Sequence, residues 1–221
     1  MTDGEDTNPN GKISTPEAPF MSSEEAALVE ETYRKATVIL EYGSGGSTRI
    51  ASKMPGKLVF SVESSFEWAM DLQAEIDASD PTSPVTLYPV DIGEVGPWGR
   101  PITMKNWRKF QRYPTAIWDE PFFRHPDVIL IDGRMRSACL VHAMMRIEKP
   151  VTVLFDDYRV RKLYQNIESL IQPDRIVGTL AQFSLTPDSL PKSKLSLVIR
   201  QFFLCSIDGG GEAFYDIEDL L

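Results

Sequence analysis

The sequence contains no long apolar run and very little cysteine. Its hydrophobic stretches are shorter than the roughly 18 residues that a membrane-spanning helix needs. Residues 1–19 are mostly polar, so we expect neither a membrane span nor a secretory signal peptide. Only 2 of the 221 residues are cysteines, and both Cys139 and Cys205 lie in apolar stretches. This pattern predicts buried thiols in a reducing compartment, and therefore a cytoplasmic protein, rather than a disulfide framework.

Positive charge is also in short supply. The chain has 23 Lys and Arg residues against 32 Asp and Glu residues, which gives a net charge of −9. Broad electrostatic binding to DNA or RNA requires a basic face, so the composition argues against a nucleic-acid partner. Two local groups of basic residues are interpreted as solvated helix faces: Lys105, Arg108, Lys109 and Arg112, and then Arg159, Arg161 and Lys162.

The composition is that of a globular protein, with 42% hydrophobic and 25% charged residues. Residues 1–20 are rich in Thr, Asn, Pro, Gly and acids, and we expect them to be disordered. Residues 21–205 are predicted to form one domain, which begins with a helix capped by Ser22. Residues 206–221 are acidic and are predicted to be a mobile tail.

Strand and helix patterns alternate along the predicted domain. We expect strands at residues 37–40, 58–62, 85–90, 128–131 and 151–155, with helices between them and a further helix at 158–171. Two more strands are expected at 175–185 and 195–204, joined by a proline-rich turn. Pro89 favours an edge position for the third strand. The prediction is an α/β fold: a doubly wound, mostly parallel seven-stranded sheet with an antiparallel C-terminal hairpin and helices on both faces.

Acidic residues and glycines gather where the predicted strands end. In open α/β sheets the ligand binds beyond the carboxyl ends of the strands. Glycines 43, 45 and 46 follow the first strand and would let the backbone approach a ligand closely. The acids at these strand ends are Glu41, Glu63, Asp91, Asp132, Asp156 and Asp157.

The first strand end, Glu41-Tyr42-Gly43-Ser44-Gly45-Gly46-Ser47, resembles the glycine motif of class I S-adenosylmethionine-dependent methyltransferases. Glu63 matches the acid that binds the ribose in that family, and the expected C-terminal hairpin matches its reversed last strand. The resemblance covers roughly residues 25–205. It implies S-adenosylmethionine as the cofactor and methyl transfer to a small-molecule acceptor, at oxygen.

The same resemblance implies a set of cofactor-binding residues. The backbone of Gly43 and Gly45 would face the methionine end of the cofactor, Glu63 would hold the ribose, and Asp91 would lie near the adenine. The full set is Glu41, Gly43, Ser44, Gly45, Ser47, Glu63, Ser64, Asp91 and Asp132.

Three other interpretations of these residues stay open. A nicotinamide-binding Rossmann domain would also place an acid about 20 residues after the glycines, although Thr48 occupies the position of its third glycine. The chain could instead bind S-adenosylmethionine without catalysis, or the glycines could form a purely structural turn.

Asp132, Asp156 and Asp157 form a second candidate site, because neighbouring strand ends bring carboxylates together. The cluster resembles the Mg²⁺ site of catechol and macrocin O-methyltransferases, where the metal activates a substrate hydroxyl. The aspartates could alternatively cap the helices that follow. Where macrocin-type enzymes carry a second aspartate, this chain has Arg134.

Three consequences of Arg134 are open: the base lies elsewhere, the arginines bind an anionic substrate, or Arg134 neutralises the cluster in place of a metal. We favour the last. The candidate catalytic residues are Asp132, Arg134 and Asp157, and the alternative metal ligands are Asp132, Asp156 and Asp157.

Residues 92–126 interrupt the alternation with many aromatic side chains. The segment leaves the ligand side of the sheet and could be a lid, complete the core, or form a homodimer contact. Within it, Trp98, Gly99 and Arg100 are expected to touch ligand. Of the two histidines, His125 is expected at the far edge of the sheet and His142 in a packed helix, so we predict no catalytic histidine.

Overall fold

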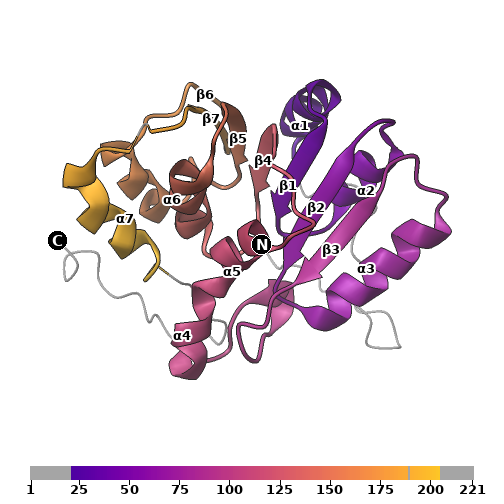
Figure 1. The fold of residues 1–221 in the computed structure, drawn as a ribbon, viewed down its shortest axis with the longest axis horizontal. Helices are drawn as coiled ribbons and strands as arrows, with labels where there is room; N and C mark the ends of the chain where they lie inside the picture. The colour runs from indigo at the N-terminus through magenta and orange to yellow at the C-terminus, as the bar shows by residue number, and fades with distance from the viewer. Residues whose placement is uncertain (1–20, 189, 205–221) are drawn as a thin grey trace, which may run out of the picture.

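A computed structural model describes residues 21–188 and 190–204. Its centre is one seven-stranded sheet with the order β3-β2-β1-β4-β5-β7-β6 (Figure 1). The strands are β1 Val38–Tyr42, β2 Leu58–Glu63, β3 Val85–Pro89, β4 Val128–Ile131, β5 Val151–Phe155, β6 Arg175–Val177 and β7 Leu180–Leu185. The first five are parallel, whereas β7 is antiparallel to both β5 and β6. The expected fold class is therefore confirmed.

Helices cover both faces of this sheet (Figure 1). The α-helices are α1 Ser23–Lys35, α2 Gly46–Lys53, α3 Phe66–Ala78, α4 Trp107–Phe110, α5 Arg112–Thr115, α6 Arg136–Arg146 and α7 Leu195–Gln201. The 3-10 helices are η1 Pro97–Gly99, η2 Met104–Asn106, η3 Ala116–Asp119, η4 Lys162–Ser169 and η5 Lys192–Lys194. Among the residues described, no helix combines the length and the hydropathy needed to cross a membrane.

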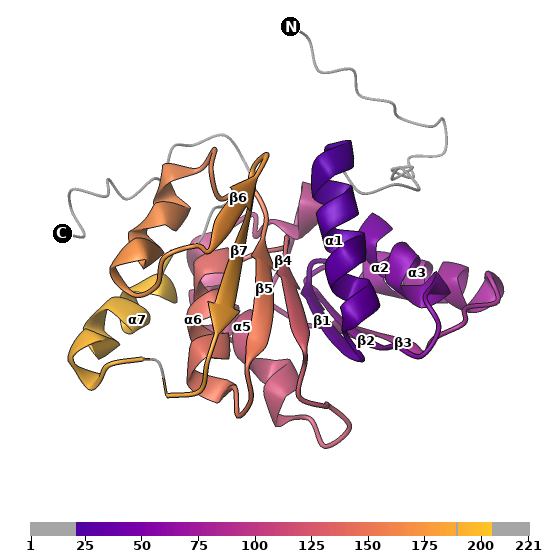
Figure 2. The ribbon, with the colours of Figure 1, turned by 90° about the horizontal axis from the view of Figure 1, so that it is seen from above.

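Alternating side chains of the strands contribute to three clusters of buried residues, the smallest of which joins α3 to Leu87 of β3. Helices α1 and α2 pack on one face around Ile39, Val59 and Leu130. Helices α5 and α6 pack on the other, around Leu40 and Ile131, and the turned view in Figure 2 shows α1 and α6 separated by the strands. These parallel strands are buried on both faces, which explains why they appear in the sequence as continuous apolar runs. Pro89 ends β3, the edge strand, as expected.

The C-terminal strands differ from the prediction. Residues 195–204 were expected to be a strand, but Leu195–Gln201 is helix α7, which packs on α6 and buries Val198 and Gln201. Both antiparallel strands instead come from residues 175–185, which fold into a hairpin around Gly178 (φ +58°). The predicted helix at 158–171 is also shorter, the 3-10 helix Lys162–Ser169.

A buried acid from the first helix holds this hairpin turn in place. The Oε1 atom of Glu25 accepts hydrogen bonds from the backbone N–H and the hydroxyl of Thr179, at 2.5 and 2.8 Å. Its other oxygen caps the start of α1. The predicted disordered segment, the acidic tail and Cys205 lie outside the described residues.

Candidate functional site

The glycine loop lies at the carboxyl edge of the sheet, against the loop that follows β4. Gly43 has φ +100°, and a Cβ atom there would lie 2.7 Å from the backbone nitrogen of Gly133. A side chain on Gly133 would in turn collide with the hydroxyl of Tyr113. The backbones of the two loops therefore touch, and only glycine fits at position 43.

Gly45 differs from Gly43 in its surroundings. A Cβ atom at Gly45 would have no atom within 4 Å, and its φ of 173° is extended backbone that any residue adopts. The fold itself therefore does not require glycine at position 45. The open space in front of this backbone is the kind of cradle that a side chain would fill and a ligand could occupy.

Glu63 ends β2 and is buried beside the glycine loop. Its Oε1 atom accepts hydrogen bonds from the N–H groups of Ser64 and Ser65, at 2.7 and 2.9 Å, and Oε2 accepts one from Ser44 at 3.3 Å. Burial raises the pKa of Glu63, whereas these N–H groups favour its charged form. The Ser64 hydroxyl also lies 3.2 Å from Oε1, so this oxygen is fully occupied, whereas Oε2 retains an acceptor position for a ligand hydroxyl.

The turn at η1 lies directly over Glu63. The hydroxyl of Ser64 donates to the carbonyl of Gly99 at 2.8 Å, and a side chain on Gly99 would strike Ser64 and Glu63. The preceding Trp98 is 61% exposed and has a left-handed backbone (φ 61°), which is uncommon for a bulky residue. Such outliers cluster at ligand clamps and switch segments.

Glu41, by contrast, is fully buried within the fold. It accepts hydrogen bonds from the hydroxyls of Tyr33 at 2.6 Å and Thr48 at 2.5 Å. The Thr48 hydroxyl also accepts from the Gly45 N–H at 2.9 Å. Burial raises the pKa of Glu41. Glu41 therefore shapes the glycine loop through Thr48, and Ser47 lies buried beside it in the first turn of α2.

Asp91 follows β3 and belongs to the start of the 92–126 segment. Its carboxylate is exposed, pairs with Lys109 at 2.7 Å and accepts the Gly93 N–H at 2.8 Å. The side-chain hydrogen bond from Lys109 lowers the pKa of Asp91. Asp91 therefore also has a structural role, because its carboxylate ties α4 to the end of β3.

The three aspartates after β4 and β5 converge on one arginine. The guanidinium of Arg136 lies 3.0 Å from Asp132, 3.3 Å from Asp156 and 3.2 Å from Asp157. It also donates to the carbonyls of Gly133 at 3.0 Å and Asp156 at 2.7 Å. The fork that we expected from Arg134 is therefore formed by Arg136, whose side chain is only 4% exposed.

This arrangement argues against the alternative of a metal site. A divalent ion would need the same carboxylate oxygens that Arg136 contacts, and ligand distances of about 2.0–2.6 Å. Within residues 21–188 and 190–204, no group of three or more His, Cys, Asp or Glu side chains is placed to hold a metal. The residues of this cluster do not fit Mg²⁺.

Asp132 is the most accessible member of the cluster. Its side chain is 40% exposed, against 11% for Asp156 and 25% for Asp157. Burial of the carboxyl raises its pKa to about 8 against the opposing charge of Arg136, and the adjacent Asp156 and Asp157 add to the rise. A carboxyl that titrates near neutral pH beside a glycine loop has the properties of a general base.

The histidines take no part in this site. His125 accepts the N–H groups of Glu148 and Lys149 at 3.0 and 3.3 Å, on the turn before β5. His142 lies between the rings of Trp118 and Phe202, and neither of its nitrogens has a hydrogen-bond partner in the described chain. Burial lowers the pKa of His142 to about 4.

The 92–126 segment divides between core and surface. Phe110, Tyr113, Ile117 and Trp118 are buried in the main core, whereas Trp98 and Trp107 are exposed. The segment thus supplies core residues and, at Gly99, a contact with Glu63. Its role as a lid stays a prediction.

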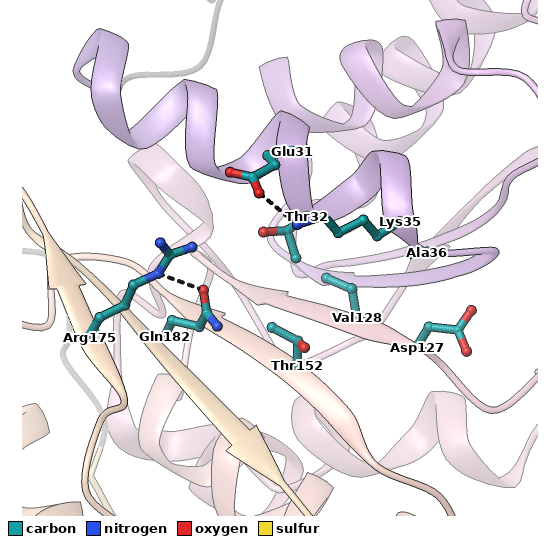
Figure 3. A pocket seen from close by; sticks show the side chains of 9 residues that line it. All are labelled: Glu31, Thr32, Lys35, Ala36, Asp127, Val128, Thr152, Arg175 and Gln182. Carbon is teal, nitrogen blue, oxygen red and sulfur yellow. Dashed lines mark hydrogen bonds and ion pairs between the residues drawn. The ribbon is translucent and has the colours of Figure 1, made fainter.

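A pocket of about 190 Å³ opens at the opposite edge of the sheet, between α1 and the strands (Figure 3). Its charged side chains bond to one another or to the backbone: Lys35 to Glu31 at 2.6 Å, Arg175 to Gln182 at 3.0 Å, and Asp127 to the start of β1. None of the strand-end acids or loop glycines lines it. The candidate site is therefore the carboxyl edge.

No protein-family model matches this chain, and neither does any curated protein. Among solved structures, a methyltransferase-like protein from Silicibacter pomeroyi is 40% identical, with a TM-score of 0.79 over 85% of this chain and 98% of that one. The O-methyltransferase TomG from Streptomyces achromogenes, solved with S-adenosylmethionine, is 14% identical over 73% of this chain and 80% of that one, with a TM-score of 0.49. An O-methyltransferase from Bacillus cereus, solved with S-adenosylhomocysteine, is 19% identical over 65% and 57%, with a TM-score of 0.41. Only the first likeness is close enough to carry an argument.

Proposed function

This chain belongs to the family of class I S-adenosylmethionine-dependent methyltransferase-like proteins, and from this premise we propose that it transfers a methyl group to an oxygen atom of a small-molecule acceptor. The observation that supports the proposal most is that Glu63 accepts a hydrogen bond from the Ser44 N–H, directly beside the open space at Gly45. The carboxylate can accept a hydrogen bond from a ligand hydroxyl, and the glycine loop leaves space for a ligand to approach its backbone.

The cofactor would be held by residues from three strand ends. The Oε2 atom of Glu63 has acceptor capacity left for a ribose hydroxyl, and Ser64 lies beside it. Residues 43–45 would line the methionine end, with Glu41 and Ser47 shaping that loop from below, and Asp91 would border the adenine. When bound, the cofactor supplies an electrophilic methyl group on a sulfonium ion.

The chain's own contribution to the chemistry is alignment and proton transfer. Methyl transfer depends mainly on in-line positioning of the acceptor in a site that excludes water. Asp132, at the end of β4, would accept the proton of the acceptor hydroxyl. Arg136 holds Asp132 at 3.0 Å and balances the charge that a metal balances in the macrocin-type enzymes.

A second candidate is a module that binds S-adenosylmethionine without catalysis. The observation that favours it is Arg134, which stands where macrocin-type enzymes carry an aspartate and cannot accept a proton. Nicotinamide binding is less well supported. Thr48 stands where the third glycine of the nicotinamide-binding motif would be, and its hydroxyl donates a hydrogen bond to the buried Glu41 at 2.5 Å.

Calorimetry of S-adenosylhomocysteine and NAD with the purified protein tests the proposal. We expect S-adenosylhomocysteine to bind and Glu63→Gln to weaken it by about 1–3 kcal/mol, since a neutral amide replaces one carboxylate oxygen with a donor. Glu67→Gln, an exposed change in the first turn of α3, is the matched control and should leave affinity unchanged. Tight NAD binding, or equal affinities in both variants, would contradict the proposed site.

A further inference from the structure

Two arginines follow β4, and only one of them is neutralised by acids. Arg136 meets three carboxylates and two carbonyls. Arg134 is half-buried, and its Nε atom is inaccessible to water and has no hydrogen-bond partner in the described chain. Nor does Arg134 form an ion pair with any acid among the described residues.

The charges around Arg134 make this arrangement costly. The positive charges of Arg136 and Arg100 act on the Arg134 guanidinium, and the side chains of Tyr113 and Tyr164 also interact with it. Burial and the charge of Arg136 lower the pKa of Arg134. A partly buried cation without an acidic partner is unfavourable unless an anion binds to it.

Basic residues also gather around this edge of an otherwise acidic protein. Residues 98–115 contain five basic side chains, Arg100, Lys105, Arg108, Lys109 and Arg112, and no acid. The turn after β5 adds Arg159, Arg161 and Lys162. Both segments leave carboxyl ends of strands, so basic side chains border the candidate site, although Lys109 is paired with Asp91 and Arg161 with Asp157. Such a rim attracts anionic small molecules.

We propose that Arg134, with Arg100 beside it, forms a subsite for an anionic group of the methyl acceptor, a carboxylate or a phosphate. The inference rests on the proposed methyl transfer at this strand edge. A guanidinium binds either group through two parallel hydrogen bonds, which would fix the orientation of the acceptor relative to Asp132. The arginine thus replaces the aspartate of the macrocin-type site with a substrate contact.

Binding of inorganic phosphate, measured by calorimetry, tests the subsite. We expect phosphate to bind the wild-type chain and Arg134→Met to weaken binding at least about tenfold, because a charge-assisted hydrogen bond contributes that much or more. Arg134→Lys should retain part of the affinity. Arg108→Met is the control: it removes an exposed charge of the same rim and should change the affinity by no more than about twofold.

Thermal stability separates a ligand site from a structural ion pair. Without phosphate, Arg134→Met should raise the melting temperature by about 2–4 °C, since it removes a half-buried charge that has no acidic partner among the described residues. A fall in melting temperature would show that Arg134 has a structural partner and would overturn the proposal. Equal phosphate binding by wild type and Arg134→Met, or none by either, would overturn it as well.

The anionic group could also come from the amino-acid end of the cofactor. If Arg134→Met weakens S-adenosylhomocysteine but not 5′-methylthioadenosine, which lacks that end, the subsite belongs to the cofactor and our assignment to the acceptor is wrong. Unchanged S-adenosylhomocysteine affinity in Arg134→Met supports the acceptor. If S-adenosylhomocysteine fails to bind the wild type, the proposed function fails, whereas the phosphate result still decides the subsite.

Discussion

Removing Arg136 should destabilise the protein strongly, because this side chain is the common partner of three carboxylates. In Arg136→Met the volume is largely kept, but Asp132, Asp156 and Asp157 lose contacts of 3.0, 3.3 and 3.2 Å. Breaking a buried ion pair from one side typically costs 3–5 kcal/mol, since it leaves charge uncompensated. For a chain of this length that loss lowers the melting temperature by roughly 6–20 °C.

Urea unfolding followed by circular dichroism measures this loss, and its pH dependence identifies the cause. Without the arginine, one carboxyl must bind a proton to relieve the repulsion, so the deficit should be larger at pH 9 than at pH 6. Arg161→Met is the control, because Arg161 is 40% exposed and pairs with one of the three carboxylates, Asp157, at 2.9 Å, with the Tyr164 ring 6.0 Å away. It should cost less than about 1 kcal/mol.

Measuring stability with added Mg²⁺ tests whether the arginine takes the place of a metal. The freed carboxylates of Arg136→Met become available to a divalent ion, so millimolar Mg²⁺ should raise the melting temperature of the variant and not of the wild type. Equal stabilisation of both by Mg²⁺ would mean that a metal binds beside the arginine. Stability of Arg136→Met within 1 kcal/mol of wild type would refute the charge argument itself.

Three other outcomes are expected. Gly43→Ala should lower the free energy of unfolding in urea by about 2–4 kcal/mol, because its Cβ would lie 2.7 Å from a backbone nitrogen. Gly45→Ala should leave the free energy of unfolding unchanged, and equal losses in the two variants would contradict the loop geometry. Because the folded pKa of His142 is about 4 and the unfolded one about 6.5, the unfolded chain binds the proton first and stability falls by about 2–3 kcal/mol as the pH drops from 6.5 to 4. In His142→Leu this part of the pH dependence should be absent, and an identical slope would argue against a neutral buried ring. Methyl-transfer rates should rise with pH through about 8, where Asp132 loses its proton, and a flat profile from pH 6.5 to 9 would exclude it as the base.

The sheet and its ligand edge could be predicted because their signals are local. Parallel strands buried on both faces appear as apolar β-branched runs, and the acids and glycines follow each run directly. The positions of Glu63 and Pro89 follow from those runs and from the handedness of parallel crossovers. Helix α7 could not be predicted from the sequence in the same way. A short apolar run is compatible with a helix or a strand, and here the packing against α6 determines that it is a helix.

The exchange of roles between Arg134 and Arg136 depends on a backbone conformation that the sequence does not signal. Met135, between them, has left-handed backbone angles (φ 47°) and is buried, and helix α6 begins only at Arg136. A bulky residue is not expected in that conformation. The burial of Glu41 was missed for a related reason: its partner Tyr33 comes from a helix whose packing is a tertiary property.

Amide hydrogen exchange of the wild-type chain, with and without S-adenosylhomocysteine, tests the central claim most directly. If the carboxyl edge holds the cofactor and the η1 turn closes over Glu63, ligand should slow exchange at residues 43–45, 63–65 and 96–100. Unchanged exchange in all three segments, or protection confined to the pocket around Glu31 and Asp127, would place the ligand elsewhere and contradict the account.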